Sequence, residues 1–213
     1  MTRSSRHDAD VEDGGASARS RILAAAVREF ARRGFAGATT TRIAEAAGVV
    51  QPLVHYHYRT KQSLFRAAVE AQLGRLDEAF KDLDRDGQDL DSEAALKLLL
   101  RRFVRFSAEN PDFADLVGRA GAQVSEVAVA APIQPPLGML TRLVKRLQAE
   151  ERLRPGLDPI LVIFAITSAA TSIFSQAELL RTLYDLDATD EKVVERHAET
   201  VVTLLAAGLI KGR

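Results

Sequence analysis

Cysteine is absent from the 213-residue sequence, which excludes disulfides, thiol nucleophiles and thiolate metal sites. The longest apolar run, residues 160–166, is far shorter than the roughly 20 residues that a membrane-spanning helix needs. The N-terminal stretch "MTRSSRHDADVEDGGASARS" lacks the apolar core of a signal peptide. We therefore expect a cytoplasmic protein that does not insert into a membrane.

Sequence motifs of common enzymes are also absent. The chain has no G-x-S-x-G elbow, no P-loop, no G-x-G-x-x-G and no histidine–carboxylate pairing at a useful spacing. His55 and His57 form an H-x-H pair, but residues two apart on a helix point to different sides and do not easily share one ion. We therefore predict a protein that is not an enzyme and that has neither a metal site nor a cofactor.

The charges are unevenly distributed, although the formal net charge is zero. Residues 17–65 carry eight basic against two acidic residues, and the rest of the chain has an acidic excess. A basic module is thus attached to a mildly acidic body. Such asymmetry suggests a polyanionic partner for the module alone.

Helical periodicity dominates the sequence, and no strand pattern is present. Ser17 is a candidate cap for a first helix that Gly34 ends. The spacing then predicts short helices over residues 39–47 and 51–58 and a longer one from Lys61 past Phe80. Later helices are expected over residues 93–108, 112–129, 137–151, 158–183 and 189–210.

The predicted fold class is all-α, with about nine helices. We expect a disordered polar tail over residues 1–16, a first domain over residues 17–65, and a second domain over residues 66–213. The charged stretch "DLDRDGQDLDSE" lies close to the boundary between the two domains. The sequence contains no internal repeat and no low-complexity segment.

Residues 39–58, "TTTRIAEAAGVVQPLVHYHY", contain two short helical patterns separated by Gly48. This arrangement is typical of a helix-turn-helix unit, whose second helix lies in the major groove of DNA. Val54 is expected to face the core, which leaves the other side chains of the second helix on the surface. Glutamine pairs with adenine and apolar atoms contact the thymine methyl group, so Gln51 and its neighbours suit base edges.

The start of the first of these two helices suits a phosphate. Thr40, Thr41 and Arg42 supply hydroxyl groups, main-chain amides and a positive charge at the positive end of the helix dipole. The alternative is that three short basic helices form a packed bundle with a solvated, charged face.

A family resemblance supports the DNA-binding interpretation. The segment "REFARRGFAGATTTRIAEAAGVVQPLVHYHYRTKQSLF" resembles the N-terminal domain of the tetracycline repressor (TetR) family. The matching features are Phe30, Gly34-Phe35, Thr39-Thr40, Ile43-Ala44, Ala47-Gly48-Val49, the ring-rich third helix, Lys61 and Leu64-Phe65. Val50 stands where a serine or acidic cap is usual, and Leu53 replaces a common threonine.

The resemblance implies a division of roles among the exposed residues. Carried over by position, it implies that bases are read by Gln51, Pro52, Leu53, Tyr56 and residues near Thr41. It also implies phosphate contacts from Thr40, His55, His57 and Lys61. The implied partner is a double-stranded DNA operator.

The stretch "ILVIFAITSAATSIF", residues 160–174, is apolar nearly all round, which indicates a helix buried on more than one side. It is interpreted as a central core helix or as a helix that shares its surface with a second subunit. The two interpretations are compatible with each other. Small side chains at Ala165, Ser168, Ala169 and Ser172 permit close helix approach. The resemblance implies a homodimer through the last two long helices, and two-fold symmetry also suits a palindromic operator.

The resemblance further implies an inducer cavity in the body. Aromatic residues at helical spacing more often form a plain core than line a ligand cavity. The apolar character of the expected lining favours a hydrophobic or amphipathic small molecule, and the helix that starts at Lys61 is the expected lever between cavity and DNA. The candidate lining residues are Phe103, Phe106, Phe113, Leu116, Val117, Met139, Leu143, Phe164 and Thr167.

Three function classes are open at this point. The first is a ligand-responsive DNA-binding repressor, and the second is a DNA-binding protein of the same fold that is controlled by a protein partner. The third is a helical small-molecule binder or enzyme whose basic module does not contact DNA. Salt-dependent DNA binding separates the third class from the other two.

Overall fold

A computed structural model describes residues 5–86, 90–122 and 138–211. The described residues form ten helices and no strand, apart from an isolated antiparallel bridge between Leu153 and Ile210. The prediction of an all-α fold is confirmed, with one helix more than expected. The described chain divides into two compact units, Met1–Gln72 with Asp115–Ala131 and Leu73–Ala114 with Pro132–Arg213. The predicted domain ranges remain predictions.

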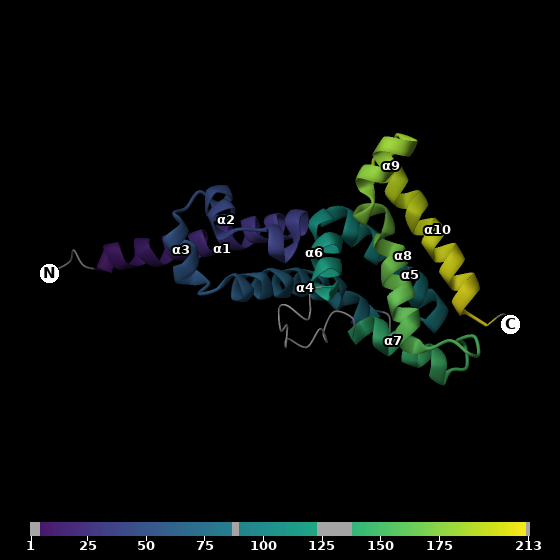
Figure 1. The fold of residues 1–213 in the computed structure, drawn as a ribbon. Coiled ribbons are helices and arrows are strands. Elements are labelled where there is room, and N and C mark those ends of the chain that lie inside the picture. The colour runs from purple at the N-terminus through teal and green to yellow at the C-terminus, as the bar shows by residue number, and fades with distance from the viewer. Residues whose placement is uncertain (1–4, 87–89, 123–137, 212–213) are drawn as a thin grey trace. The chain divides into compact units, whose positions relative to one another are not determined.

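Figure 1 labels the helices in the order in which they follow one another along the chain. In chain order they are α1 (Ser5–Gly37), α2 (Thr40–Ala47), α3 (Gln51–His57), α4 (Lys61–Asp86), α5 (Ser92–Glu109), α6 (Pro111–Ala122), α7 (Gly138–Ala149), α8 (Pro159–Ser175), α9 (Ala177–Tyr184) and α10 (Glu191–Leu209).

Helix α1 begins at Ser5, whereas the sequence predicted a disordered tail up to residue 16 and a cap at Ser17. The polar residues before Ser17 show no amphipathic stripe, so periodicity gave no signal for them. Extending a helix that already exists avoids the cost of a new nucleus, which explains how a polar stretch joins it. The expected break at Gly34 is present: the backbone of this residue is not helical, with φ 67° and ψ 178° inside α1.

The first unit has its core where α1, α2, α3 and the first turns of α4 meet. Phe30 and Phe65 are fully buried, and their rings lie edge to face with centroids 4.9 Å apart. Phe35 closes this aromatic cluster, 5.4 Å from Phe65. Ile43 from α2 and Val54 from α3 are buried as well, so both short helices hold one apolar face against α1.

The second unit is built around α5, which packs against α7, α8 and α10. Its apolar centre contains four phenylalanine rings, each in edge-to-face contact with two of the others. Phe80 lies 6.1 Å from Phe103 and 6.3 Å from Phe106, and Phe113 lies 6.2 Å and 5.1 Å from the same two rings. We call these four residues the phenylalanine cluster.

The predicted helix over residues 158–183 is wrong in one respect, because it breaks at Gln176 into α8 and α9. Hydroxyl groups near the break donate to main-chain carbonyls one turn back, as Ser175 does to Thr171 at 3.2 Å. Such bonds compete with the helical ladder and bend helices. The apolar pattern continues across the break, so the sequence pattern did not indicate that the helix ends at Ser175.

No single helix among the described residues is both long and apolar enough to cross a membrane. The pair Pro159–Ser175 and Ala177–Tyr184 passes that test by length and composition, with a bend of 56°.

Candidate nucleic-acid interface

Thr39 and Gly48 fix the two ends of α2. Thr39 caps the N-terminus, and its side-chain oxygen accepts a hydrogen bond from the Arg42 amide at 3.3 Å. Gly48 ends the helix with φ 65° and ψ 40°, a left-handed conformation that suits glycine because it has no Cβ. The turn that separates α2 from α3 is therefore encoded locally.

Helix α3 is a short helix held by one buried side chain. Val54 faces the core, and the amide of Tyr58 donates to the Val54 carbonyl at 2.8 Å to close the last turn. Val50 provides no side-chain hydrogen bond at the N-terminus, and Pro52 occupies the first turn, where its missing N–H does no harm. The helix thus depends on tertiary packing.

The expected base-reading residues differ in their exposure. Gln51 and Pro52 are exposed, and Tyr56 is 79% exposed. Leu53 is only half-buried, so part of its side chain is reachable from outside. These side chains share the outer surface of α3.

A direct hydrogen bond links the starts of α2 and α3. The Gln51 side-chain amide donates to the Thr40 hydroxyl at 3.1 Å. This contact brings a predicted base reader and a predicted phosphate contact together and orients the Gln51 amide. The sequence alone did not show that these two groups touch.

Arg42 and Thr41 lie on the exposed surface of the first turn of α2. The Arg42 guanidinium donates a long hydrogen bond of 3.5 Å to the Gly37 carbonyl and lies 3.9 Å from a Glu29 carboxylate oxygen. Both contacts are long and the Arg42 side chain is half exposed, so Arg42 is able to exchange them for contacts with another anion.

The two histidines of α3 lie in different environments. His55 is exposed, whereas His57 is half-buried. The Nε2 atom of His57 is buried and lacks a hydrogen-bond partner among the described residues. The ring of His57 also lies edge to face with Tyr56, at 5.2 Å. Of the two, His55 presents its ring to solvent more openly.

Lys61 is held at the start of α4 by the loop after α1. Its Nζ donates to the Ala36 carbonyl at 3.2 Å and lies 4.7 Å from the centre of the Phe35 ring. Partial burial lowers the pKa of Lys61 below its ordinary value. Lys61 therefore also fixes α4 to the first unit, a role that the sequence analysis missed.

Three further residues of the first unit were not singled out from the sequence. Arg21 donates through Nε to the Ala47 carbonyl at 3.1 Å, where a cation suits the negative end of α2. Thr60 and Ser63 cap α4 reciprocally, because the Ser63 amide donates to the Thr60 hydroxyl at 3.0 Å and the Thr60 amide donates to the Ser63 hydroxyl at 3.2 Å. The Thr-x-x-Ser spacing was the available signal for that cap.

The predicted ligand-lining residues are divided between the two units. Phe103, Phe106, Phe113 and Leu143 are buried in the second unit. Leu116 is buried and Val117 half-buried, and both fall in the first unit.

Of the three remaining residues of the expected lining, Thr167 and Phe164 differ in their exposure. Thr167 is half-buried and its hydroxyl donates to the Ile163 carbonyl at 3.1 Å. The Met139 side chain lies outside the described residues. Phe164 is 63% exposed, which corrects the expectation that it faces an interior. Because α8 is apolar nearly all round, its sequence pattern did not show which side points inward.

Similarity to known proteins agrees with these observations. A model described as "Bacterial regulatory proteins, tetR family" matches residues 22–68. A second model, described as "Tetracyclin repressor-like, C-terminal domain", matches residues 93–205 and so covers more than half of the chain. The chain belongs to the TetR family. Its members are DNA-binding transcriptional regulators, which agrees with the helix-turn-helix geometry of α2 and α3.

Individual TetR-like relatives resemble the chain to different extents. The uncharacterised helix-turn-helix regulator YerO of Bacillus subtilis (strain 168) is 30% identical over 66 residues, which are 31% of this chain and 23% of that protein. The match thus spans under a quarter of that relative. A solved structure from Streptomyces coelicolor, described as a candidate transcriptional regulator, is 26% identical with a TM-score of 0.66, over 90% of this chain and 97% of that one.

A further solved structure shares the fold at lower identity. The transcriptional regulator FadR of Bacillus subtilis, in complex with stearoyl-CoA, is 17% identical with a TM-score of 0.63. The similarity covers 89% of this chain and 98% of that one.

Proposed function

We propose that this TetR-family protein is a ligand-responsive repressor that binds a palindromic operator as a homodimer. The exposed outer surface of α3, with Gln51 oriented by Thr40 at 3.1 Å, is the observation that carries this proposal. Each protomer places one α3 in a major groove, and two half-sites lie about 34 Å, or one helical turn, apart.

The proposed division of roles follows from chemistry and exposure. Gln51, Pro52, Leu53 and Tyr56 contact base edges, since an amide recognises adenine and apolar atoms contact the thymine methyl group. Phosphates are bound by the threonines and cations around them. The proposed phosphate contacts are Thr40, Thr41, Arg42, His55, His57 and Lys61.

The proposed dimer uses α8, α9 and α10. The side chains of Ile160, Leu161 and Phe164 are exposed on α8, as are those of Leu179 and Leu183 on α9. A single chain rarely leaves so many large apolar side chains exposed to water. We infer that a second copy of the chain covers this surface, which we call the α8–α9 face.

The proposed inducer is a hydrophobic or amphipathic small molecule that binds within the second unit. Phe103, Phe106, Phe113, Leu143 and Thr167 are the proposed contacts there, and Leu116, Val117 and Met139 remain predicted ones. FadR of Bacillus subtilis in complex with stearoyl-CoA is a structural relative with an amphipathic ligand, which supports the proposed ligand class.

Release of DNA requires the inducer to prefer one conformation of the dimer. A shift from mostly binding-competent to mostly incompetent protein takes about 5.5 kcal/mol of differential affinity. Burial of about 220 Å² of apolar surface supplies that amount at about 25 cal/mol per Å². Helix α4 is the proposed lever, because it runs without interruption from Lys61 to Asp86.

One experiment tests the DNA-binding proposal and its division of roles. The operator is selected from random DNA, and the affinities of Gln51→Ala and Lys61→Ala are measured on operator and random duplexes at several salt concentrations. Gln51→Ala costs about 1–3 kcal/mol on the operator and relaxes the choice at one base position. Lys61→Ala weakens both duplexes alike and reduces the slope of log affinity against log salt by about one.

Two results would contradict this scheme. If the two variants behave alike on operator and random DNA, the assigned roles are wrong. If no duplex binds in a salt-dependent manner, the basic module does not bind DNA at all. Because Lys61 also bonds to Ala36, the thermal stability of the variant is measured alongside.

A second candidate function is supported by the phenylalanine cluster. The rings of Phe80, Phe103, Phe106 and Phe113 contact one another edge to face, which is how aromatic side chains fill a core. A filled core favours a DNA-binding protein that is controlled by a protein partner. Titration of the DNA-bound protein with acyl-CoA thioesters and free fatty acids separates the two functions. Release of the operator supports a repressor that responds to an amphipathic inducer, and no release supports control by a protein partner.

A further inference from the structure

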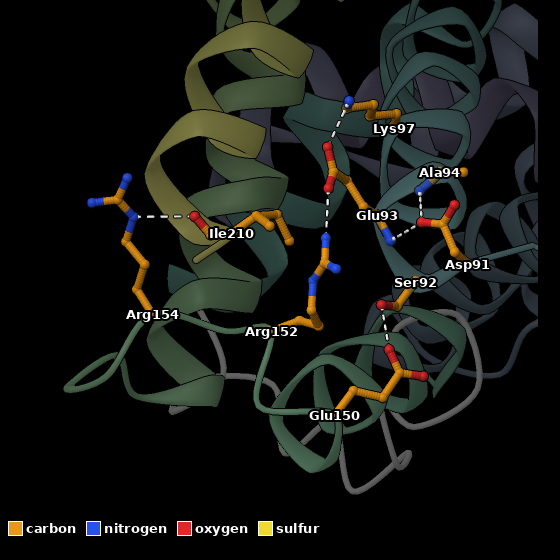
Figure 2. Close-up of polar contacts among 9 residues, drawn as sticks. All are labelled: Asp91, Ser92, Glu93, Ala94, Lys97, Glu150, Arg152, Arg154 and Ile210. Carbon is orange, nitrogen blue, oxygen red and sulfur yellow. Dashed lines mark hydrogen bonds and ion pairs between the residues drawn. The ribbon is translucent and has the colours of Figure 1, made fainter. Parts of the chain in front are cut away.

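Few polar side chains are buried in the part of the chain that the structure describes. They are Gln72, Ser92 and Ser107. Figure 2 shows the Ser92 hydroxyl pointing to the Glu150 carboxylate, to which it donates a hydrogen bond. The Ser107 hydroxyl donates to the Phe103 carbonyl at 2.9 Å. Both serines are thus satisfied within the protein, as buried polar groups usually are.

Gln72 is the exception among these three. Its side chain is only 4% exposed, and its Oε1 atom is buried without a hydrogen-bond partner among the described residues. A buried amide oxygen without a partner is unfavourable, because water solvates the same group in the unfolded chain. The other described side chains with an unpartnered buried atom, such as that of His57, belong to residues that are only half-buried.

The position of Gln72 on α4 makes the missing partner more unusual. Residues four apart share one face of a helix, and one buried stripe of α4 contains Leu64, Ala68, Gln72, Leu76 and Phe80. Gln72 is the polar member in the middle of this apolar stripe. Leucine or methionine would form helix as well as glutamine does and would leave no polar atom unsatisfied. Neither packing nor helix formation therefore accounts for the amide.

We propose that Gln72 is a polar contact for the inducer, and that its Oε1 atom accepts a hydrogen bond from a hydroxyl group of that molecule. The inference rests on the proposed function in one respect, namely that the chain binds an inducer. It narrows the ligand class to molecules that carry a hydroxyl group on a hydrocarbon skeleton. Leu116 and Val117, two of the predicted ligand contacts, are apolar residues of the same unit as Gln72.

A buried acceptor gives such a site its selectivity. A ligand with a hydroxyl group satisfies the oxygen, whereas an equally apolar ligand without a donor leaves it unpaired and is bound less tightly. A trapped water molecule could satisfy the same oxygen. In that case the amide would stabilise the protein without ligand, and replacing it would lower the stability.

The place of Gln72 along α4 connects this contact to DNA release. Gln72 follows Lys61, the proposed phosphate contact, by 11 residues on the same helix, which is about 16 Å along the axis at 1.5 Å per residue. A hydrogen bond that forms only with the ligand favours the position of α4 in which it is made. Such a preference for one conformation is what release of the operator requires.

Calorimetric titration of the full-length protein with 1-decanol and with its isomer methyl nonyl ether tests the proposal. The two probes have the same atoms, but only the alcohol has an O–H group to donate. We expect the unmodified protein to bind 1-decanol at least about tenfold more tightly than the ether, because the ether leaves the acceptor unpaired. In Gln72→Met the alcohol loses this advantage, and the affinity for the ether stays the same.

Thermal unfolding without ligand is the second measurement. Gln72→Met keeps an unbranched side chain and removes the unpaired oxygen, so the midpoint temperature should rise by about 2–4 °C. Gln62→Met is the matched control, because Gln62 is an exposed glutamine on the same helix. It should change neither the midpoint nor the preference for the alcohol.

The proposal is overturned if the unmodified protein binds the two isomers equally, or if Gln72→Met keeps the preference for the alcohol. A lower midpoint for Gln72→Met, or failure of this variant to fold, also overturns it, because the amide is then satisfied in the protein without ligand. If both isomers release the operator equally well, the proposed repressor function survives and only the role of Gln72 fails. If neither isomer binds, the proposed inducer class fails, and the role of Gln72 fails with it.

Discussion

The two units of the protein use polar contacts over very different sequence distances. In the first unit the bonds Gln51–Thr40, Lys61–Ala36 and Arg21–Ala47 join residues 11, 25 and 26 positions apart. In the second unit Ser92 bonds to Glu150 across 58 residues and Arg101 to Glu199 across 98. The contacts that join α1, α2, α3 and the start of α4 therefore span shorter sequence distances than those that join the helices of the second unit.

The exposed surfaces of the two units also differ in chemistry. Helix α3 presents an amide and rings with polar atoms, as at Gln51 and Tyr56, whereas the α8–α9 face presents aliphatic and phenyl groups, as at Leu183 and Phe164. A polar exposed surface suits a charged, hydrated partner such as DNA. An apolar one suits a partner that removes it from water. Each unit thus carries the surface that its proposed partner requires.

The largest expected effect comes from the phenylalanine cluster. If the cluster is core, Phe106→Ala lowers the free energy of unfolding by about 3–5 kcal/mol, because a large cavity replaces the ring. Chemical denaturation of the variant and the unmodified protein measures the difference. A loss below about 1 kcal/mol would show that the ring borders an existing cavity, and so would favour the inducer over the filled core.

A charge on the α8–α9 face is expected to separate the protomers. Leu183 is 62% exposed in one chain, so Leu183→Asp leaves the protomer fold intact while placing a charge in the proposed interface. Sedimentation should then show a monomer, and operator affinity should fall at least about 100-fold, since bivalent binding is lost.

The matched control for Leu183→Asp adds the same charge elsewhere. Gln148 is exposed near the end of α7, and Gln148→Asp should change neither sedimentation nor operator affinity. Unaltered sedimentation of Leu183→Asp would show that the α8–α9 face is not the interface between protomers.

Two glycines, one in each unit, are expected to respond to alanine in opposite directions. Gly48 has φ 65° and open space where a Cβ would lie, and Gly74 lies inside α4 with similar open space. Gly48→Ala should lower stability by about 1–2 kcal/mol because of the left-handed backbone. Gly74→Ala should raise it by up to about 1 kcal/mol because alanine favours helix. Thermal unfolding measures both, and equal signs would contradict the assignment of Gly48 to the turn.

The smallest expected effect is a pH dependence from His197 on α10. Burial is the largest cause that lowers the pKa of His197 below its ordinary value, and Nε2 lies 3.3 Å from the Ala170 carbonyl. The unfolded chain therefore binds this proton more tightly than the folded one. Stability contributed by neutral His197 is present above the ordinary pKa of about 6.5 and is lost as the pH falls below it.

Urea denaturation between pH 7.5 and pH 5 tests this effect. His197→Gln should show a smaller loss of stability on acidification than the unmodified protein. An unchanged slope would assign the acid dependence to other groups.

Several features of the fold and the site were predictable because their signals are local. The cap at Thr39, the breaks at Gly34 and Gly48 and the buried position of Val54 follow from residue type and spacing. The start of α1 at Ser5 was missed, because a polar stretch has no amphipathic stripe. The break at Gln176 was missed because hydroxyl–carbonyl bonds, not a proline or glycine, bend the chain there.

The functional surfaces also differ in how far apart their residues lie in the sequence. The exposed residues of α3 are consecutive in sequence, so a single helical pattern located them. An open groove in the second unit combines residues near positions 93–101, 152–154 and 199–211, and no pattern within one segment indicates that they meet. The contact between Gln51 and Thr40 lies between these cases, because it joins two predicted residues whose proximity only the fold reveals.

The long reach of the Arg101–Glu199 pair has a consequence for biosynthesis. A ribosome adds about 5–20 residues per second, so the 98 residues that separate the partners take on the order of 5–20 seconds to follow. The bonds of Gln51, Arg21 and Lys61 are complete as soon as Lys61 has emerged. Helix α7 and helix α8 can cover part of α5 earlier, but the surface of α5 that packs against α10 stays uncovered until α10 has been made. The nascent second unit is therefore the part of the protein that is exposed to aggregation for longest.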